Sequence, residues 1–295
     1  GQAGRDIGID QLVPTDRLPG TNEWVVFQSP ITGGDQANLE RPCVVAVEGG
    51  CEVRVNGVAA PVATLANPGD YVFLPQSSYD ANGIMFITTN RKAYLFHNTN
   101  AAPAQNGLSL GIIPSLPCAS SDRVEIPSAE YWADASNATQ VSIVTRVGAT
   151  LSVLSNGVAV APSTHSVPGT TLWQAHKYSF TSGATTRLEV TSDQQFVVTV
   201  NGGQSNRGGT GTFTGFSRAP VIVSPFDSPT ATVSYPVTLT LSETNGYATN
   251  GYQWYLNGSA IAGATGDTLV ATVPGVYSVT GTSNTCGVSP QSADV

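Results

Sequence analysis

Short apolar runs alternate with turn residues along almost the whole chain. Runs such as "VVAV" (44–47) and "AYLF" (93–96) are strand-sized, and Gly, Pro, Asn or Asp interrupts them every few positions, as in short strands joined by turns. No stretch keeps an apolar period of about 3.6 residues over three turns, the pattern of a surface helix. The chain is therefore predicted to be all-β, with helices short or absent.

Three segments have the form of a β-hairpin, in which a strand is followed by a turn and a second strand. They are "VVAV-EGG-CEVRV" (44–55), "VATL-ANPGD-YVFL" (62–74) and "GIMFITT-NRK-AYLFHN" (83–98). Gly and Asn tolerate the positive φ that tight hairpin turns require. We expect the two strands of each segment to pair with one another.

The turn residues recur at a fixed spacing. Asn56-Gly57 and Asn156-Gly157 lie 100 positions apart, as do Pro68-Gly69 and Pro168-Gly169. The strand lengths between these turns agree as well. The simplest explanation is an internal duplication of one β-unit of about 100 residues.

The second copy keeps the turns but changes the chemistry between them. After a three-residue insertion, segment 187–202 follows the pattern of 84–98, whereas Asp70 of the first copy is replaced by Thr170. The repeated turns are therefore interpreted as scaffold rather than as a binding motif. A binding function should be sought on surfaces that differ between the copies.

A different module begins near Ala219. Trp254 in "YQWYLNG" is placed like the buried tryptophan of an immunoglobulin-like sandwich, and Tyr277 in "PGVYSVTGT" like the aromatic residue that opens a late strand. Both are interpreted as core residues that are diagnostic of the fold. We expect seven or so short strands in this module.

The length agrees with several domains, because single cores stop growing at roughly 250–300 residues and the chain has 295. We predict tandem β-sandwich domains: a first copy over 1–118, a second copy over 119–217 and an immunoglobulin-like or PKD-like domain over 218–295. The chain begins with Gly1 and shows no signal-peptide pattern, so we expect a processed protein or a piece of a longer one.

The amino-acid composition limits the classes of partner that the chain is expected to bind. Only 11% of residues are charged, whereas Gly (31) and Pro (19) are abundant, which is typical of extracellular β-modules. The net charge is −8 with 12 Lys and Arg, so no basic surface is expected for nucleic acid or for anionic membranes. Apolar runs are too short to span a bilayer, and no membrane insertion is expected.

Four cysteines lack the spacing of a zinc site: Cys43, Cys51, Cys118 and Cys286. One disulfide could form if the compartment is oxidising. A bond between Cys43 and Cys51 would require a looser hairpin than the one predicted, and a bond between Cys51 and Cys118, or none, is equally consistent with the sequence.

Residues for catalysis are sparse. Each of the three histidines, His97, His165 and His176, is better explained as a structural or surface residue than as a base. No nucleophile elbow, zinc-protease motif or phosphate loop occurs. The Gly-rich segment 201–216 is not followed by a helix that could hold a phosphate. The chain is predicted not to be an enzyme and to need no cofactor.

Carboxylates cluster twice. Asp6, Asp10 and Asp16 lie near one another in the sequence, as do Asp122 and Glu125. Calcium would suit the first group, because hard cations take clustered oxygen ligands. No EF-hand loop is present, however, and exposed acidic loops explain both groups equally well.

Several motifs point to a known family. The segments "DQLVPTDRLPGTNEWVVF" (10–27), "VNGVAAPVATLANPGDYVFLPQSSYDANGIMFITTNRKAYLF" (55–96) and "NGLSLGIIPSLPC" (106–118) resemble the IgGFc-binding-protein N-terminal-like domain of very large secreted surface proteins in gliding (Bacteroidetes-type) bacteria. The resemblance covers roughly residues 1–215. Residues 219–295 resemble the immunoglobulin-like or PKD-like repeats of the same proteins.

The resemblance implies an adhesin or filament component, exported by the type IX secretion pathway to the cell surface. It does not imply that the chain binds immunoglobulin. We expect a non-enzymatic structural or adhesive module of an extracellular filament or appendage, used for surface attachment, gliding or contact with other (prey) cells. Its partners would be other copies of itself, in a homo-oligomer, or neighbouring domains of a longer chain, and its cell-surface or polysaccharide target stays open.

The alternative is a carbohydrate-binding accessory module of a secreted hydrolase. Four aromatic residues could then serve as contact platforms for sugar if they were exposed together: Tyr79, Tyr131, Trp132 and Trp173. Such aromatics more often fill the core.

Overall fold

The structure is a computed structural model. It describes residues 15, 18–30, 40–102, 107–116, 121–129, 138–181, 185–204, 207–214, 219–223, 234–242, 247–283, 287–289 and 291–295. Apart from one short 3₁₀ helix, η2 (Gln76–Ser78), the regular elements of these residues are strands. The predicted all-β class with tandem sandwiches is confirmed. The chain divides into two compact units, Gly1–Thr214 and Gly215–Val295.

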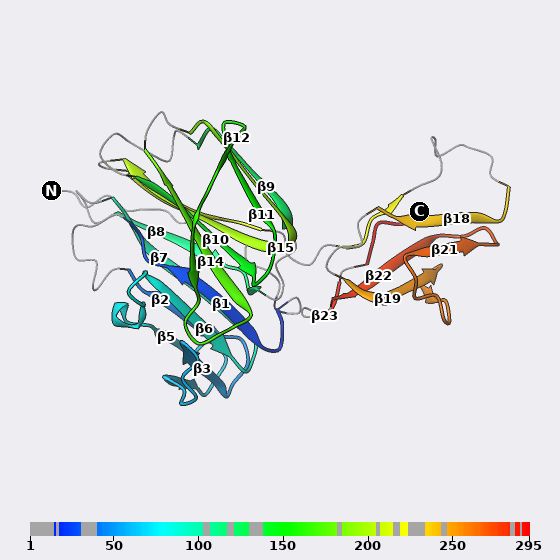
Figure 1. Cartoon of the computed structure of the whole chain (residues 1–295). Helices are drawn as coiled ribbons and strands as arrows, with labels where there is room; N and C mark the ends of the chain where they lie inside the picture. The colour runs from blue at the N-terminus through cyan, green and yellow to red at the C-terminus, as the bar shows by residue number, and fades with distance from the viewer. Residues whose placement is uncertain are drawn as a thin grey trace. The chain divides into compact units, whose positions relative to one another are not determined.

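The first β-unit is a sandwich of two four-stranded antiparallel sheets (Figure 1). One sheet has the order β1 (Asn22–Phe27), β6 (Ile84–Thr89), β3 (Cys51–Val55), β4 (Ala63–Leu65). The other has the order β5 (Tyr71–Phe73), β2 (Pro42–Ala46), β7 (Ala93–Ala102), β8 (Gly107–Ile113). Alternate residues of both sheets point inward and fill the core between them, as in other sandwiches.

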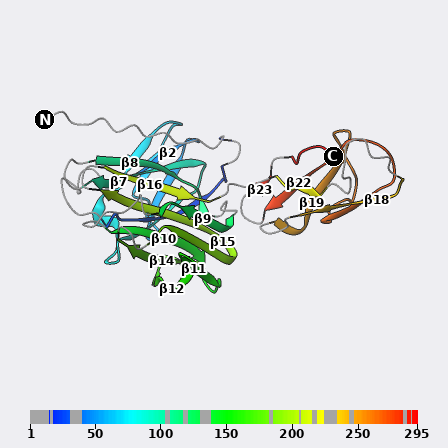
Figure 2. The same cartoon turned by 90° about the horizontal axis from the view of Figure 1, so that it is seen from above.

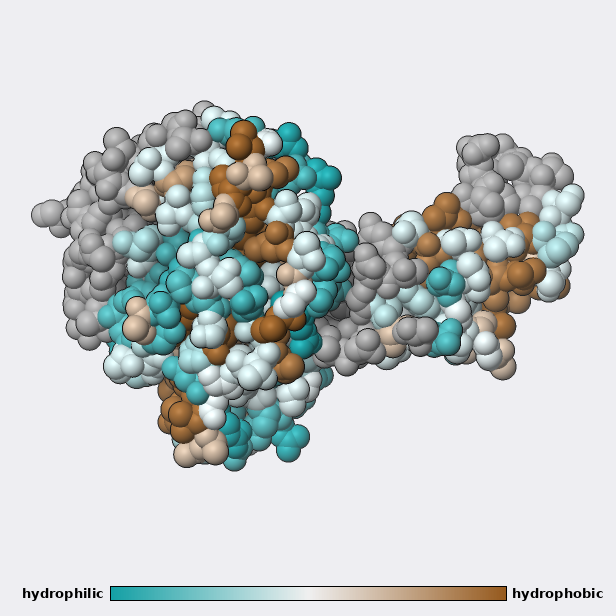
Figure 3. All heavy atoms as spheres, in the orientation of Figure 1, coloured by the Kyte–Doolittle hydropathy of each residue, from teal (hydrophilic) through white to brown (hydrophobic). Residues whose placement is uncertain are grey.

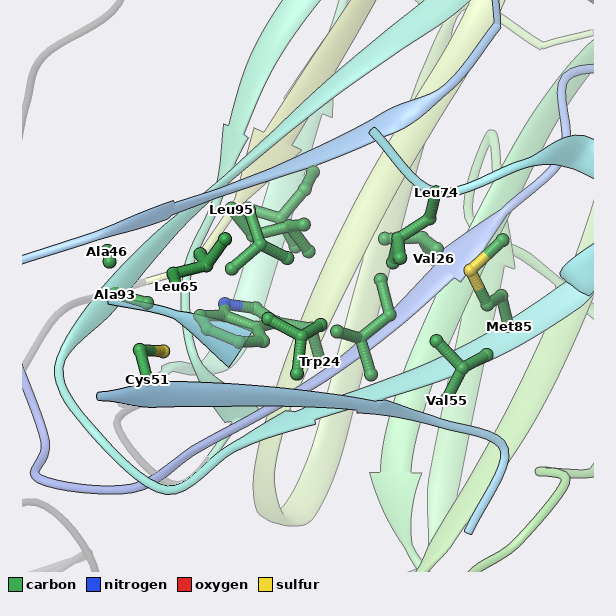
Figure 4. Packing of buried hydrophobic residues seen from close by; sticks show 14 residues of the cluster. Trp24, Val26, Ala46, Cys51, Val55, Leu65, Leu74, Met85, Ala93 and Leu95 are labelled. Atoms are coloured by element: carbon green, nitrogen blue, oxygen red, sulfur yellow. The ribbon is translucent and has the colours of Figure 1, made fainter. Parts of the chain in front are cut away.

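Trp24 lies inside this core and is 1% exposed. Leu95, Leu65 and Val26 surround it, and Cys51 lies at one end of the cluster (Figure 4). Aromatic side chains of this size dominate the energetics of a small core. The two sheets of the first β-unit are therefore held together mainly by apolar packing.

The three predicted hairpins are wrong in their pairing. Strands β2 and β3, which flank the turn at 47–50, belong to different sheets, and the same is true of β4 and β5 and of β6 and β7. Each connection crosses from one sheet to the other. A turn signal shows where the chain reverses, but it does not show which strand pairs next, because strands of both sheets alternate in the same way.

The second β-unit repeats this arrangement. Its strands are β9 (Ser121–Pro127), β10 (Thr139–Arg146), β11 (Leu151–Ser155), β12 (Val158–Val160), β13 (Ser163–Ser166), β14 (Trp173–Phe180), β15 (Arg187–Gln204) and β16 (Arg207–Phe213). The long strand β15 serves both layers: its first part pairs with β9 and β11, and its second part pairs with β10 and β16. These are the partners that β6 and β7 have in the first β-unit, which confirms the duplication.

The two copies differ by one residue in the register of one strand. Val44 pairs with Val72 and Leu95, and its counterpart, which pairs with His176 and Val198, is Ile143. A constant spacing of 100 would instead match Val44 to Val144. Successive strand residues face opposite sides of a sheet, so this difference decides which residues face outward.

A third apolar cluster joins the two β-units. It combines one face of the β1–β6 pair with strands β10, β14 and β15, and it contains Val25, Phe27, Ile84, Phe86, Leu116, Val144, Val167, Trp173, Ala175 and Val197. Strand β16 also contacts β7 and β8, beside which it runs in Figure 2. The two β-units share a core, and the division between residues 118 and 119 stays a prediction.

Polar contacts line the edge of this shared core. The indole Nε1 of Trp173 donates to Glu23 Oε2 at 2.5 Å, and Arg146 stacks 4.1 Å from the centre of the same ring. The ammonium group of Lys177 donates to the carbonyl of Asn82. Trp173 therefore links the second β-unit to the first.

The Asn-Gly turns use one device in all three modules. Asn56, Asn156 and Asn257 have φ of 51°, 51° and 50°, and each side-chain Oδ1 accepts a hydrogen bond from a backbone N–H of a neighbouring segment. The donors are Phe86, Thr186 and Val276, at 2.9, 2.8 and 2.9 Å. Asparagine tolerates this left-handed conformation and supplies the acceptor, so both properties of the residue are used.

The unit Gly215–Val295 is a smaller sandwich. One sheet contains β17 (Ile222–Val223), β18 (Val237–Leu241) and β21 (Thr268–Ala271), and the other contains β20 (Ser259–Ala260), β19 (Tyr247–Leu256), β22 (Tyr277–Ser283) and β23 (Gly287–Val288).

The core of this smaller sandwich contains Trp254, which is fully buried, and Tyr277. Trp254 Nε1 donates to the carbonyl of Gly266 at 2.9 Å, and the Tyr277 hydroxyl donates to the carbonyl of Val273 at 2.8 Å. Both residues lie where the sequence interpretation placed them.

Candidate functional site

Among the described residues, strand pairing defines an exposed apolar surface on the outer face of the sheet β5-β2-β7-β8. Val45 pairs with Tyr71 on one side and with Tyr94 on the other, so these three residues form one row across the sheet. Cys43 pairs with Phe73 and Phe96 and forms the next row. Residues directly opposite one another in a sheet point to the same side. We call the four aromatic residues of these rows the aromatic face.

The aromatic face is accessible and its rings contact one another. Tyr71 is 63% exposed and Phe73 is 44% exposed, while Tyr94 and Phe96 are half-buried. Tyr71 and Phe73 meet edge to face with ring centres 5.7 Å apart, and Tyr94 and Phe96 are 6.2 Å apart. The guanidinium of Arg41 lies 5.6 Å from the centre of the Phe73 ring. Clustered exposed aromatics with an arginine are typical of contact surfaces.

Other exposed apolar residues of the first unit are scattered by comparison. Val58, Val62, Val147, Val158 and Leu172 are each more than half exposed. Val147 N–H donates to the carbonyl of Leu172 at 3.0 Å, so these two form one pair, but none of the five is aromatic. In the view of Figure 3, hydrophobic residues form separate patches between polar ones. Single exposed apolar residues are normal on protein surfaces, whereas a contiguous patch marks a candidate interaction site.

A buried polar cluster lies elsewhere in the first β-unit. The Tyr79 hydroxyl and His97 Nε2 are 2.8 Å apart, and Glu40 Oε1 lies 4.0 Å from the same nitrogen. Ser29 N–H donates to Glu40 Oε1 at 2.6 Å. Burial lowers the pKa of His97 to about 3. Burial, and then the charge of Glu40, raise the pKa of Tyr79 well above its ordinary value.

This cluster is closed to substrates. His97 is 1% exposed and Glu40 is fully buried, so both groups contact protein rather than solvent. A neutral histidine at neutral pH, hydrogen-bonded to a neutral phenol, is a satisfied core group. The arrangement supports the structural interpretation of His97.

The other two histidines are also engaged in local contacts. His176 Nε2 lies 3.0 Å from the Thr145 hydroxyl, and its Nδ1 lies 3.0 Å from that of Thr164. Burial, and then the neighbouring His165, lower the pKa of His176. His165 Nε2 lies 3.0 Å from the Ser163 hydroxyl. In none of these contacts does a carboxylate orient the ring, as it would in a catalytic triad.

Of the four aromatic residues predicted as contact platforms, the structure describes two, and both pack in apolar cores. Trp173 is 4% exposed and belongs to the shared core, and Tyr79 packs against the core of the first β-unit with its hydroxyl on His97. Tyr131 and Trp132 lie outside the described residues. Trp173 and Tyr79 are thus core residues rather than sugar platforms.

Of the two predicted carboxylate groups, only the second lies within the described residues. Asp6, Asp10 and Asp16 lie outside the described residues. Glu125 takes part in an exposed ladder, in which it contacts Arg187 at 2.7 Å and Arg123 at 3.6 Å. Arg123 also contacts Glu189 at 3.2 Å. Among the described residues, no group of three or more His, Cys, Asp or Glu is arranged to hold a metal ion.

Two cysteines can be placed. Cys43 and Cys51 are buried, lie in different sheets of the first β-unit and are not bonded to one another. Burial raises the pKa of both thiols; in Cys51, hydrogen bonds to Thr89 and Arg91 partly oppose this effect. Cys118 and Cys286 lie outside the described residues, so a bond between Cys51 and Cys118 stays a prediction.

Sequence reasoning missed the aromatic face, although a signal was present. In both "YVF" (71–73) and "YLF" (94–96), aromatic residues at i and i+2 flank an aliphatic residue. In a strand this spacing puts both aromatics on one side. The central residues, Val72 and Leu95, point into the core, so the aromatics must point outward. A strand that is apolar on both sides indicates either a covered sheet or a contact surface.

Chemically, the aromatic face can bind by stacking and apolar burial, and Arg41 adds a cation. No helix among the described residues is long and apolar enough to cross a membrane.

Comparison with known proteins identifies one family. A family model described as IgGFc binding protein matches residues 1–202. No curated protein matches the chain. Among solved structures, the chain is similar to the full ectodomain (Ig1–Ig3) of mouse nectin-like molecule 4, with 12% identity and a TM-score of 0.22 over 93% of each chain. It is also similar to a lectin from Pleurotus ostreatus in complex with GalNAc, with 11% identity and a TM-score of 0.19 over 68% of this chain and 77% of the lectin. Because both TM-scores are this low, the fold is assigned from the strand pairing described above and not from these similarities.

Proposed function

Because the chain belongs to the IgGFc binding protein family through residues 1–202, we propose that it is a non-enzymatic binding module of a secreted cell-surface protein. More specifically, it is a structural and adhesive part of an extracellular filament or appendage, exported by the type IX pathway and used for attachment, gliding or cell contact. Immunoglobulin binding is not part of this proposal.

The observation that carries the proposal is the aromatic face. Tyr71 and Phe73 lie on the short edge strand β5, which pairs with β2 and packs Val72 against the core, so the backbone that carries both rings is fixed before any partner arrives. Preorganised aromatic side chains lose little conformational entropy on binding and bury a large area. The buried, hydrogen-bonded state of His97 and His176 supports a binding rather than a catalytic role.

The scaffold suits a mechanical role as well. Its strands pair over long sequence separations, for example β1 with β6 and β9 with β15, and one shared core joins the two β-units. Unfolding such a body requires many non-local contacts to break together.

Surface labelling tests the proposal. Antibodies raised against the purified chain should label intact, unpermeabilised cells of the source organism, and the same antibodies should reduce attachment of those cells to a solid surface. Labelling that appears only after permeabilisation would overturn the proposal. An antiserum against a cytosolic protein is the control for cell integrity.

Carbohydrate binding is the second candidate, and the exposure of Tyr71 and Phe73 is the observation that favours it, because aromatic rings stack on the apolar faces of sugars. The chain would be retained on a column of immobilised polysaccharide. Retention should be lost in Tyr71→Ser/Phe73→Ser and kept in Val158→Ser, which changes an exposed valine on another strand. Elution of the wild-type chain in the void volume of every polysaccharide column tried would reject this candidate.

A further inference from the structure

The duplication allows each outer face of one β-unit to be compared with its counterpart in the other. The row Tyr71–Val45–Tyr94 corresponds to the row Ala175–Val144–Val197, because Val144 pairs with Ala175 and Val197 as Val45 pairs with Tyr71 and Tyr94. The aromatic face is therefore the counterpart of one particular face of the second β-unit.

That counterpart is an interface. Val144, Ala175 and Val197 are buried in the shared core, where they pack against the outer face of β1 and β6. This face of the repeated sheet thus already serves for sheet-to-sheet packing in the second β-unit. In the first β-unit the same face has larger side chains, of which Tyr71 and Phe73 are exposed to solvent.

A second outer face also differs between the copies: it is apolar on β1 and β6 of the first β-unit, but it carries charged side chains on β9 and β15 of the second. Val25 pairs with Phe86 and Phe27 with Ile84 in the first β-unit. The equivalent of the Val25–Phe86 pair in the second β-unit is Pro127 with Arg187, and the neighbouring pair Glu23–Thr88 corresponds to Glu125 with Glu189.

Arg123 and Arg187 bridge these two glutamates in an exposed ladder. Packing an aromatic face onto the ladder would remove several charges from water, which is unfavourable. A polar outer face of this kind ends an array of repeats.

We propose that the aromatic face joins two copies of the chain face to face in a symmetric dimer. This inference deepens the proposed function and rests on it, since it names the surface through which the module associates. The charged ladder disfavours a head-to-tail contact, whereas a second aromatic face supplies apolar area and aromatic partners. Arg41 lies over the Phe73 ring of its own chain, so a two-fold axis through the face would also bring one guanidinium from each copy to the interface.

The size of the face sets the expected strength. A stable interface buries about 800 Å² on each partner, and a large aromatic side chain accounts for about 150–250 Å² when fully buried. Four aromatic residues that are already partly covered, together with Val45 and Arg41, supply less than this area. We expect a reversible dimer that forms at micromolar concentrations and is insensitive to salt.

Sedimentation velocity on the full chain over a concentration series tests the proposal. The wild-type chain should shift from monomer to dimer as concentration rises, and Tyr71→Ser/Phe73→Ser should stay monomeric throughout. The matched control Val158→Ser/Leu172→Ser removes two exposed apolar residues elsewhere and should dimerise as the wild type does. Circular dichroism and thermal unfolding confirm that all three proteins fold.

Several outcomes would overturn the proposal. A wild-type chain that stays monomeric at the highest concentration, or a Tyr71→Ser/Phe73→Ser variant that dimerises as the wild type does, would reject it. Dimers that dissociate in high salt and in Arg187→Glu would show head-to-tail contact through the ladder instead. A monomer retained on immobilised polysaccharide through the aromatic face would assign this face to sugar. None of these results changes the outcome of surface labelling, so failure of the dimer and failure of the proposed function are distinguishable.

Discussion

Gly57 and Gly169 lie backbone to backbone, one in each β-unit. Both have positive φ, of 72° and 76°, and a Cβ on Gly57 would lie 2.6 Å from the Cα of Gly169. A Cβ on Gly169 would overlap the backbone of Asn56 and Gly57. The first Asn-Gly turn thus packs directly on the second Pro-Gly turn. Their counterparts, Gly157 and Gly69, also have positive φ but have no neighbour within 4 Å of such a Cβ.

This asymmetry predicts different costs for one substitution at related sites. Gly157→Ala and Gly69→Ala should lower the free energy of unfolding by about 1 kcal/mol, the cost of a left-handed conformation for alanine. Gly57→Ala and Gly169→Ala add a backbone overlap in the contact between the β-units, and overpacking costs a further ~1–3 kcal/mol. Urea unfolding of the four variants measures the difference. Equal losses at all four sites would show that the two turns do not touch in solution.

The repeated turns were visible in the sequence, but their contact was not. The Asn-Gly and Pro-Gly pairs specify the local conformation of each turn, and this conformation is the same in both copies. Whether the first or the second copy of each turn lies at the contact depends on how the two sandwiches pack. That packing is decided by distant residues such as Phe27 and Val144. The three hairpins were wrong for the same reason. Pairing partners such as β1 and β6 are separated by more than 50 residues, and no local signal encodes them.

Trp173 is predicted to stabilise the contact between the β-units through its indole N–H. Trp173→Phe keeps a ring in the shared core but removes the hydrogen bond to Glu23, and bonds to charged groups contribute about 1.5–3 kcal/mol. We expect unit Gly1–Thr214 to lose roughly 2 kcal/mol of stability. In the double variant with Glu23→Ala, which removes the acceptor, the two losses should not add, because both remove one interaction.

Trp254→Phe provides the matched control. It removes a hydrogen bond from indole to the carbonyl of Gly266 inside unit Gly215–Val295. Differential scanning calorimetry should show that Trp254→Phe lowers the transition of that unit and that Trp173→Phe lowers the transition of the larger unit. A shift of both transitions in either variant would contradict independent unfolding of the two units.

The thiols of Cys43 and Cys51 are predicted to be unreactive in the native protein. Both are buried and burial raises their pKa, so little thiolate is present at neutral pH to attack an alkylating reagent. Iodoacetamide should leave both residues unmodified in native buffer and modify both in denaturant without reductant. Peptide mass mapping assigns each site. If Cys51 resists modification in denaturant until a reductant is added, it is in a disulfide, and Cys118 is the partner to examine.

The sequence could identify the cores but not the candidate site. Trp254 and Tyr277 could be assigned to the core because their neighbours have the spacing of a sandwich. Tyr71 and Phe73, by contrast, belong to a segment with apolar residues at every position from 71 to 74. Such a segment is as consistent with a sheet covered on both sides as it is with an exposed contact surface. Whether a second layer covers the outer side is a property of the assembled fold. The i, i+2 spacing could place both rings on one side of the strand, whereas their exposure to solvent follows only from the assembled fold.

His97 makes the stability of unit Gly1–Thr214 depend on pH. Its pKa is lowered to about 3 in the folded protein by burial, against about 6.5 for an unfolded histidine. Between these values the unfolded chain binds the proton and the folded chain does not, so protonation favours unfolding. The contribution of His97 is complete above pH ~6.5 and is lost as pH falls toward 3, by about 1.4 kcal/mol per pH unit. His176, whose pKa is also lowered, acts in the same direction.

Two variants separate the titration from the contact. His97→Gln has no proton to gain in this range, so its free energy of unfolding should fall less steeply than that of the wild type between pH 6.5 and pH 4, with the slope smaller by ~1 kcal/mol per pH unit. Tyr79→Phe removes the 2.8 Å contact with the imidazole but leaves the imidazole in place. It should therefore lower stability at every pH and keep the wild-type slope. Urea unfolding at a series of pH values measures both, and parallel wild-type and His97→Gln curves would show that His97 is protonated equally in the folded and unfolded chains.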